Sequence, residues 1–405
     1  MKTVKPSLTA SFLLSLQWPS INIKHLTFIE FSTAMKLAAL RKALHQHPEL
    51  SDQEQLTAQT IVNFLRPLKP DELYTGVGGT GVIAVFKGNQ PGDNVLFRCE
   101  LDALPIDETS DFDHCSKNPG VAHKCGHDGH MAMVCGLAEI LAANRHFTGQ
   151  RLLLFQPAEE TGQGALAVVA DPVFKSLNVE YSYALHNLPG VPLGQIQIKA
   201  GTFNCASRGM SIQFTGQGVH AAYPEQGRSP AAGLTELLDA LLAFEFVSTG
   251  DELQMLTVVY AKLGEKSFGT TPEQAEVAVT LRSSSNQGMQ QMVEQLTALA
   301  AQTANEHHLQ HSIDWHDVFL ASVNDSNCAK QVAESAKALG MNLVWLDQPL
   351  RWSEDFGAIS EQSKGAMFVL GAGESTPQLH TAHYDFPDTL LEIGLALFEH
   401  IAYAH

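Results

Sequence analysis

The sequence predicts an α/β protein in which helices flank a mostly parallel sheet and a smaller α+β domain is inserted. At 405 residues the chain exceeds the usual size of a single hydrophobic core, so two domains are expected. Apolar runs alternate with helical repeats through its first half, which is typical of a parallel sheet covered on both faces. Between residues 207 and 316 the order changes to β-α-β-β-α-β, the pattern of a ferredoxin-like unit.

The elements of the first half follow from the spacing of apolar residues. From Met35 to about Leu68 these residues recur at three- and four-residue intervals and predict helices. Short apolar runs bounded by turn residues then predict strands, and functional residues are expected beyond the carboxyl ends of such strands. The predicted strands are residues 81–86, 94–101, 151–155, 181–185 and 196–199, and the predicted helices are residues 130–144 and 165–176.

A second run of elements defines the inserted domain. Its predicted strands are residues 209–215, 254–262, 274–282 and 312–315, and its predicted helices are residues 230–246 and 288–306. Helix and strand patterns resume over residues 325–404. We therefore expect a first part of the larger domain at residues 35–206, the inserted domain at 207–316, and a second part of the larger domain at 317–405.

Residues 1–34 form an atypical leader in this interpretation, and we expect it to be disordered. Lys2 and Lys5 precede a short apolar stretch at residues 12–16, a weak signal-peptide pattern without a convincing cleavage site. A non-native extension or a mis-assigned start codon explains the leader as well as a targeting role does.

The composition argues against several partners. Asp and Glu number 43 against 25 Lys and Arg, which gives a formal charge of −18 and a field that repels nucleic acids and anionic membranes. No apolar run reaches the roughly 18–20 residues of a membrane span. Six scattered cysteines without a CxxC pair favour a reducing compartment, so a cytoplasmic location is expected.

Two patterns have plain structural explanations. The glycines of residues 76–81 match GxGxxG, but the phosphate-binding form must open a helix, whereas here a predicted strand follows, so we expect a turn between strands. His45 and His47 lie two apart on a predicted helix and face different sides. The histidines of residues 307–311 lack the glutamate of an HExxH motif. Both histidine clusters are interpreted as surface histidines.

Residues 125–130, with the sequence CGHDGH, form the first candidate metal-binding pattern. Potential ligands or orienting groups fall close together, and two glycines permit a tight turn. Taken alone, Cys125 beside His127 fits a buried small residue, a nucleophile or a thiolate ligand.

Paired carboxylates at a predicted strand end strengthen the metal interpretation. Glu159 and Glu160 follow the apolar run 152–155, and one carboxylate can bind a metal ion while the other takes a proton from water. Further polar groups follow predicted strands or lie near the C-terminus, namely Asp102, His186 and His380. Each has a structural explanation alone, but their convergence on strand ends predicts one site.

At these residues the chain resembles the dinuclear metal-dependent amidohydrolases and metallopeptidases that include aminoacylases, hippurate hydrolases and indoleacetyl-amino-acid hydrolases. The matching segments occur in the family's order over roughly residues 44–386, and CGHDGH followed by FQPAEE is a highly specific pair. The segments are LHQHPELS, GVGGTGVIA, ELDALP, NPGVAHKCGHDGH, FQPAEET, ALHNLPG, GQGVHAAYP, SEDF and LHTAHYDF.

The resemblance implies a zinc-peptidase-like catalytic domain with two divalent metal ions and an inserted ferredoxin-like lid domain that commonly forms a homodimer. Mixed sulfur, nitrogen and oxygen ligands leave the metal open between zinc, manganese, nickel and cobalt. By motif, Cys125 would bridge the ions, with Glu160 and His380 completing one subsite and His127 and His186 the other.

The same resemblance assigns three further roles. Glu159 would be the general base that takes a proton from water and returns it to the leaving amine. Asp102 would orient a metal ligand, as carboxylates behind such ligands do. His220 would stabilise the oxyanion, across a dimer interface if the lids pair.

One departure concerns the lid. The family commonly carries an Asn in an N-x-I-P segment that helps to bind the substrate carboxylate or the oxyanion, whereas Gly269 stands at that place here. Loss of this Asn would shift substrate preference or lower activity, unless a nearby side chain such as Arg282 or Thr270 takes over its role.

The expected activity is hydrolysis of a small N-acyl or N-aroyl amino acid to a carboxylate and a free amino acid. A dipeptidase or aminopeptidase of the same fold is the neighbouring alternative. A metal-stabilised binding module without turnover is the alternative from another class, although a structural metal site needs no spare base such as Glu159.

Overall fold

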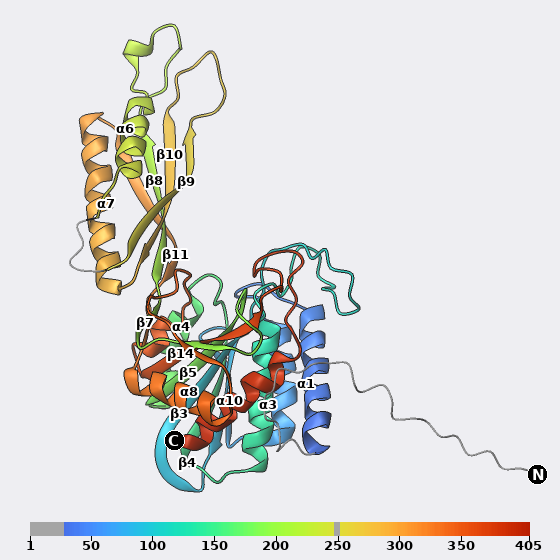
Figure 1. The fold of residues 1–405 in the computed structure, drawn as a ribbon. Coiled ribbons are helices and arrows are strands. Elements are labelled where there is room, and N and C mark those ends of the chain that lie inside the picture. Colours follow the sequence, from blue (N-terminus) through green and yellow to red (C-terminus); the bar gives the residue numbers. More distant parts are fainter. Residues whose placement is uncertain (1–27, 247–251) are drawn as a thin grey trace, which may run out of the picture.

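The computed structural model describes residues 28–246 and 252–405, with side chains from residue 35 onward. Helix α1 (Phe28–Gln46) begins before the expected start at Met35, and residues 1–27 of the expected leader lie outside the described residues. The described chain forms a larger body and a smaller one that projects from it (Figure 1).

The larger body is built on an eight-stranded sheet. Its strands are β1 (Glu72–Val77), β2 (Gly81–Lys87), β3 (Gln90–Glu100), β4 (Thr148–Gln156), β5 (Tyr181–Pro189), β6 (Ile196–Ile198), β13 (Leu343–Trp345) and β14 (Lys364–Gly373). They lie in the order β1-β2-β4-β3-β5-β14-β6-β13. The central strands β4, β3, β5 and β14 run parallel, while β2 and β6 join them antiparallel on either side. The prediction of a mostly parallel sheet is confirmed.

Helices cover both faces of this sheet because its strands carry apolar side chains on both. In β2, Ala84 and Phe86 pack in one core, whereas Ile83 and Val85 pack in the other. The first core receives α1, α2 (Gln55–Leu65), α3 (His127–Ala143), α8 (Ser326–Ala338) and α10 (Leu390–Ala404). The second core receives α4 (Gly164–Ala170), α5 (Pro172–Ser176) and α9 (Gly357–Ser360).

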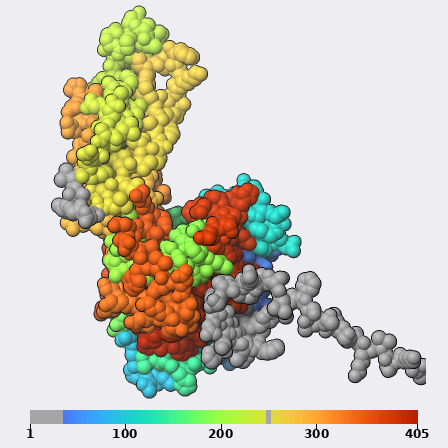
Figure 2. All heavy atoms as spheres, in the orientation of Figure 1, coloured from blue at the N-terminus to red at the C-terminus, as the bar shows by residue number. Residues whose placement is uncertain are grey.

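The smaller body has the predicted ferredoxin-like order. In the chain it runs β8 (Ala206–Thr215), η2 (Pro224–Gln226), α6 (Ala231–Leu242), β9 (Gln254–Leu263), β10 (Gln274–Ser283), α7 (Asn286–Glu306) and β11 (Gln310–Phe319). Its antiparallel sheet has the order β11-β8-β10-β9 and shares a core of its own with α6 and α7. The space-filling view shows this domain standing away from the larger body (Figure 2).

The two bodies meet where the chain leaves and re-enters the larger one. There β7 (Gly201–Asn204) pairs antiparallel with β12 (Ser322–Asn324), so the outgoing and returning segments are hydrogen-bonded to each other. Arg282, near the end of β10, also donates to the backbone oxygen of Arg351 at 2.8 Å and to Ser353 Oγ at 3.0 Å. The base of the inserted domain is therefore tied to the larger body.

Two local predictions have clear outcomes. The GxGxxG glycines form the turn between β1 and β2, where Gly78 has φ +62°, so the turn interpretation is confirmed. The single predicted helix at residues 165–176 is wrong, because the chain forms α4 and α5 instead. Asp171 caps α5 by accepting from Val173 N, and Pro172, which lacks an N–H, begins that helix.

The interpretation of His45 as a surface histidine is also wrong. Its ring is buried, with Nδ1 2.8 Å from Asp128 Oδ2 and Nε2 3.1 Å from Glu108 Oε1. Burial disfavours its charged form, but these two carboxylates outweigh that effect and raise the pKa of His45 to about 9. Arg41, one turn earlier on α1, lies 3.4 Å from the same Asp128 carboxylate. The buried carboxylate thus draws two cationic side chains of α1 inward.

Among the described residues, no helix has the length and apolarity needed to cross a membrane. All six cysteines fall within the described ranges, and none of them forms a disulfide.

The packing predicts how the larger body responds to a core truncation. Leu137 on α3 is fully buried, so Leu137→Ala should lower the free energy of unfolding by about 2–5 kcal/mol. Leu56 on α2 is 69% exposed, and Leu56→Ala should stay within about 0.5 kcal/mol of the parent. Denaturant unfolding of both variants checks this, and equal losses would contradict the assigned core.

Candidate metal centre

The predicted site residues of the larger body gather at one end of its sheet. They follow or end neighbouring strands, or lie at the start of α3, because the carboxyl ends of parallel strands share an edge. Asp102 follows β3, Glu159 and Glu160 follow β4, His186 lies in β5, His380 follows β14, and Cys125 and His127 lie where α3 begins.

Two groups of candidate ligands share Cys125. In the first, Cys125, His127 and His186 bring ligand atoms within 4.8 Å of one another, and Cys125 Sγ lies 3.3 Å from His186 Nε2. In the second, Cys125 groups with Glu160 and His380, and His380 Nε2 lies 3.4 Å from Cys125 Sγ. The arrangement has the form of two adjoining subsites with the thiol between them.

Hydrogen bonds behind the candidate ligands orient their free atoms. His127 Nδ1 lies 2.9 Å from the backbone oxygen of Asp102, and His186 Nδ1 lies 2.8 Å from that of Asn187. Each contact leaves Nε2 directed to the cluster, which is how metal-binding histidines are fixed. Asp102 Oδ2 also accepts from Glu160 N at 3.0 Å, so Asp102 supports both sides of the cluster.

The turn that carries Cys125 and His127 requires a glycine at position 126. Its φ of +92° lies in the left-handed region, and a Cβ there would come 2.4 Å from Asn187 Oδ1 and 2.9 Å from Tyr384 Oη. Gly126 therefore lets the turn approach Asn187 closely enough for the thiol to reach His186.

The cluster concentrates acidic groups where water is excluded. Burial, and then the charges of Glu160 and Glu159, raises the pKa of the Cys125 thiol above its usual range. Burial likewise raises the pKa of Glu160 to about 7. Burial opposes protonation of His127, but its bond with Asp102 and the nearby carboxylates raise its pKa to about 10. These groups hold protons that a divalent cation would displace.

Unpartnered donors show that the residues suit metal ions. His127 Nε2 and Glu160 Oε1 are buried and have no hydrogen-bond partner among the described residues. Buried polar atoms are normally paired, and a metal ion that displaces the proton of His127 would satisfy such nitrogen and oxygen atoms grouped with a thiol. The sulfur, nitrogen and oxygen donors together fit divalent transition metals.

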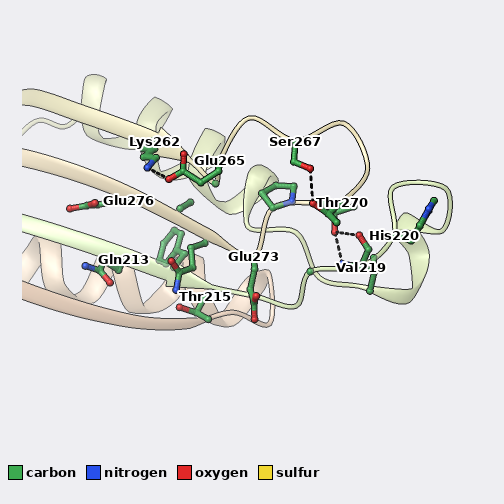
Figure 3. A pocket seen from close by; sticks show the side chains of 17 residues that line it. Gln213, Thr215, Val219, His220, Lys262, Glu265, Ser267, Thr270, Glu273 and Glu276 are labelled. Carbon is green, nitrogen blue, oxygen red and sulfur yellow. Dashed lines mark hydrogen bonds and ion pairs between the residues drawn. The ribbon is translucent and has the colours of Figure 1, made fainter.

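His220 is the predicted site residue that the chain does not bring to this cluster. It lies at the far end of the inserted domain, exposed, where its Nδ1 accepts from Ala222 N at 3.0 Å. A hollow of about 780 Å³ there is lined by His220, Ser267 and Thr270 (Figure 3). Gly269 lies beside it in open space, with nothing within 4 Å of a Cβ placed on it.

Of the two side chains considered as replacements for the missing Asn, neither faces His220 with a free donor. Thr270 donates to Ser267 Oγ at 3.1 Å, while Arg282 lies at the base of the inserted domain.

Several residues of the site region were not predicted from the sequence. Arg98, Gln156, Glu354 and Asp355 form a buried polar cluster behind Glu159. The sequence did contain a signal for this cluster, because a charged residue such as Arg98 inside an apolar strand requires buried partners of opposite charge. Gln156 is the last residue of β4, whereas Glu354 and Asp355 lie more than 250 residues away from Arg98 in the chain, in the SEDF segment.

Comparisons with known proteins find a matching family and similar enzymes. The model of the family described as Peptidase family M20/M25/M40 matches residues 96–404. Hippurate hydrolase of Campylobacter jejuni is 28% identical, over 90% of this chain and 94% of that protein. N-acetylcysteine deacetylase of Bacillus subtilis is 28% identical, over 91% of this chain and 96% of that protein.

A solved structure extends the agreement to three dimensions. A Bacillus subtilis protein described as a dinuclear metal binding peptidase from the M20 family superposes with a TM-score of 0.78. It is 27% identical, and the match covers 92% of this chain and 98% of that one.

The shared position of Cys125 predicts distinct metal contents for two variants. Cys125→Ala should reduce bound metal from about two ions per chain to fewer than one, because both groups lose a ligand. His380→Ala should keep about one ion, since only the second group contains it. Elemental analysis after dialysis measures this. His383→Ala, an exposed histidine outside both groups, is the control and should match the parent.

Proposed function

Because the chain belongs to peptidase family M20/M25/M40, we propose that it hydrolyses the amide bond of a small N-acyl or N-aroyl amino acid. The products are a carboxylate and a free amino acid. The names of both relatives support this substrate class, since each denotes release of an N-linked acyl group from an amino acid. A dipeptidase of the same fold is the alternative, which a free amino terminus on the best substrate would favour.

One observation carries the proposal, namely the different surroundings of the adjacent Glu159 and Glu160. Glu160 groups with Cys125 and His380, whereas Glu159 lies outside that group with its Oε2 3.7 Å from His127 Nε2. A second carboxylate beside the ligands is needed for catalysis but not for a structural metal site. We assign Glu159 as the base that takes a proton from the attacking water and delivers it to the leaving amine.

The candidate ligands would hold two divalent ions, of zinc, manganese, nickel or cobalt. Cys125, Glu160 and His380 would serve one ion, and Cys125, His127 and His186 the other. When bound, such ions supply Lewis-acid polarisation of the scissile carbonyl. Asp102 would keep His127 and the backbone of Glu160 in place during turnover.

The inserted domain would act as a lid and as the contact between two copies of the chain. Its edge strand β9 presents Val259, Tyr260 and Leu263, and the neighbouring α6 presents Leu242, all at least 41% exposed. Exposed apolar groups along an unpaired strand edge favour pairing with a second copy. In such a homodimer His220 would serve the oxyanion in the partner's site. The unpaired cysteines fit a cytoplasmic location.

Glu159→Gln should abolish turnover while the metal content stays that of the parent. The amide keeps the shape of the side chain but cannot accept the proton, so kcat should fall by about 10²–10⁴-fold. Glu160→Gln, the adjacent control, should lose metal together with activity. Amine release from N-acetyl-, N-benzoyl- and indoleacetyl-amino acids and from dipeptides, with manganese, zinc or nickel, provides the assay. No release from any of them by the parent protein would favour a binding module.

The cross-subunit role of His220 predicts complementation between two inactive variants. Mixed dimers of Glu159→Gln and His220→Ala chains contain one site with both groups intact, so random pairing should restore about a quarter of parental activity. In the control pair, Glu159→Gln with Cys125→Ala, both substitutions affect residues that a site takes from its own chain, so each mixed dimer lacks an intact site and should stay inactive. Absence of complementation in the first mixture would contradict the cross-subunit role, and a fully active His220→Ala protein would place His220 outside the reaction.

A further inference from the structure

We infer that Asp355 is a positioning residue that clamps both ends of the loop between Gln156 and Ala165, the loop that carries Glu159 and Glu160. Its kinetic consequence rests on the proposed function, whereas its structural claim does not. The hydrogen bonds of Asp355 go to Gln156, Ala165 and Arg98, which are not among the candidate ligands.

The carboxylate of Asp355 holds the two ends of this loop at once. Its Oδ1 and Oδ2 each accept from Gln156 Nε2 at 2.9 Å, and Gln156 is the last residue of β4. Oδ2 also accepts from the backbone N of Ala165 at 2.8 Å, in the first turn of α4. One buried side chain thus joins the end of the strand to the start of the helix that follows.

The loop between these ends needs such support. Ala158 has φ +48°, a left-handed conformation that a residue with a Cβ adopts only when its surroundings impose it. The backbone N of Gly164 donates to Ala158 O at 3.0 Å, and a Cβ on Gly164 would lie 1.6 Å from Pro157 O. The chain therefore closes on itself tightly just where Glu159 and Glu160 project toward the metal centre.

Arg98 fixes Asp355 in turn. Its fully buried guanidinium lies 2.7 Å from Asp355 Oδ1 through Nη2, and its Nε donates to Gln156 Oε1 at 2.9 Å. The planar guanidinium of Arg98 therefore holds Asp355 and Gln156 at a fixed separation, which the single ammonium group of a lysine would not do.

Glu354 provides a matched comparison. It binds the same guanidinium, at 2.7 Å and 3.1 Å, and its carboxylate lies within 4.8 Å of those of Glu159 and Asp355. Its described hydrogen bonds go to Arg98 and to the backbone N of Asp355, not to the loop. Removing either carboxylate deletes the same charge beside Glu159, but only loss of Asp355 opens the clamp.

Asp355→Asn tests the inference with little change of shape. Both carboxylate oxygens of Asp355 accept hydrogen bonds, from Arg98, Gln156 Nε2 and Ala165 N. The amide would replace one of these acceptors by an NH₂ group, which cannot accept from them. Amide hydrogen exchange in a peptide spanning residues 156–165 should become about tenfold faster. Metal content should fall, since Glu160 lies on the loop, and kcat should drop about 10²-fold with KM within about threefold. Glu354→Gln should leave the exchange unchanged and kcat within about fivefold of the parent.

Two outcomes would overturn the inference. Equal exchange rates in the Asp355→Asn and Glu354→Gln proteins would mean that charge alone matters, and unchanged exchange in Asp355→Asn would mean that no clamp exists. If Asp355→Asn does not fold, Gln156→Met removes one end of the clamp and should speed exchange in the same peptide. If the parent protein releases no amine, the proposed function fails, but exchange and metal content still decide the inference.

Discussion

The end of the sheet that carries the candidate site depends on one buried cation, the guanidinium of Arg98. It binds Glu100, Glu354 and Asp355, all of which are buried with it. Removing such a cation would leave buried carboxylates uncompensated, at a cost of about 3–5 kcal/mol. Burial and the neighbouring carboxylates raise the pKa of Glu159 well above its ordinary value, so acidic groups crowd this part of the site. Arg98 binds the carboxylates in the interior of the site. The side chains around Cys125 in its outer part fit divalent metal ions.

A chain of contacts connects Arg98 to the turn that bears Cys125 and His127. Glu100 lies 2.7 Å from Nδ1 of His130, whose Nε2 lies 2.6 Å from Asn187 Oδ1. The same Asn187 oxygen occupies the space that a Cβ at Gly126 would need. A residue deep in β3 therefore fixes the turn before α3 as well as the loop after β4. Partners of this kind behind the ligands control how a metal site binds its ions.

The sequence was informative where a functional group adjoins an apolar run, and uninformative where partners are distant in the chain. Glu159, His186 and Asp102 could be placed at one edge because each follows or ends a predicted strand. Asp355 could not be connected to Gln156, because 199 residues separate them and only the folded sheet brings them together. His45 was misjudged for the same reason, since its burial depends on Asp128 of another helix. The break at Asp171 and Pro172 is different, because its capping signal was present in the sequence.

His220 lies too far from the metal cluster of its own chain to contact it in this arrangement of the two domains. His220 lies beyond β8, a ten-residue strand that runs from the junction to the far end of the inserted domain. At about 3.3 Å per residue, that strand places it roughly 30 Å from the base of the domain. Folding the domain back would have to bend the paired segments β7 and β12 and break the bonds of Arg282 to the larger body. A second copy joined along the edge of β9 would avoid that disruption, so the proposed role of His220 at a metal centre favours a dimer over a bend within one chain.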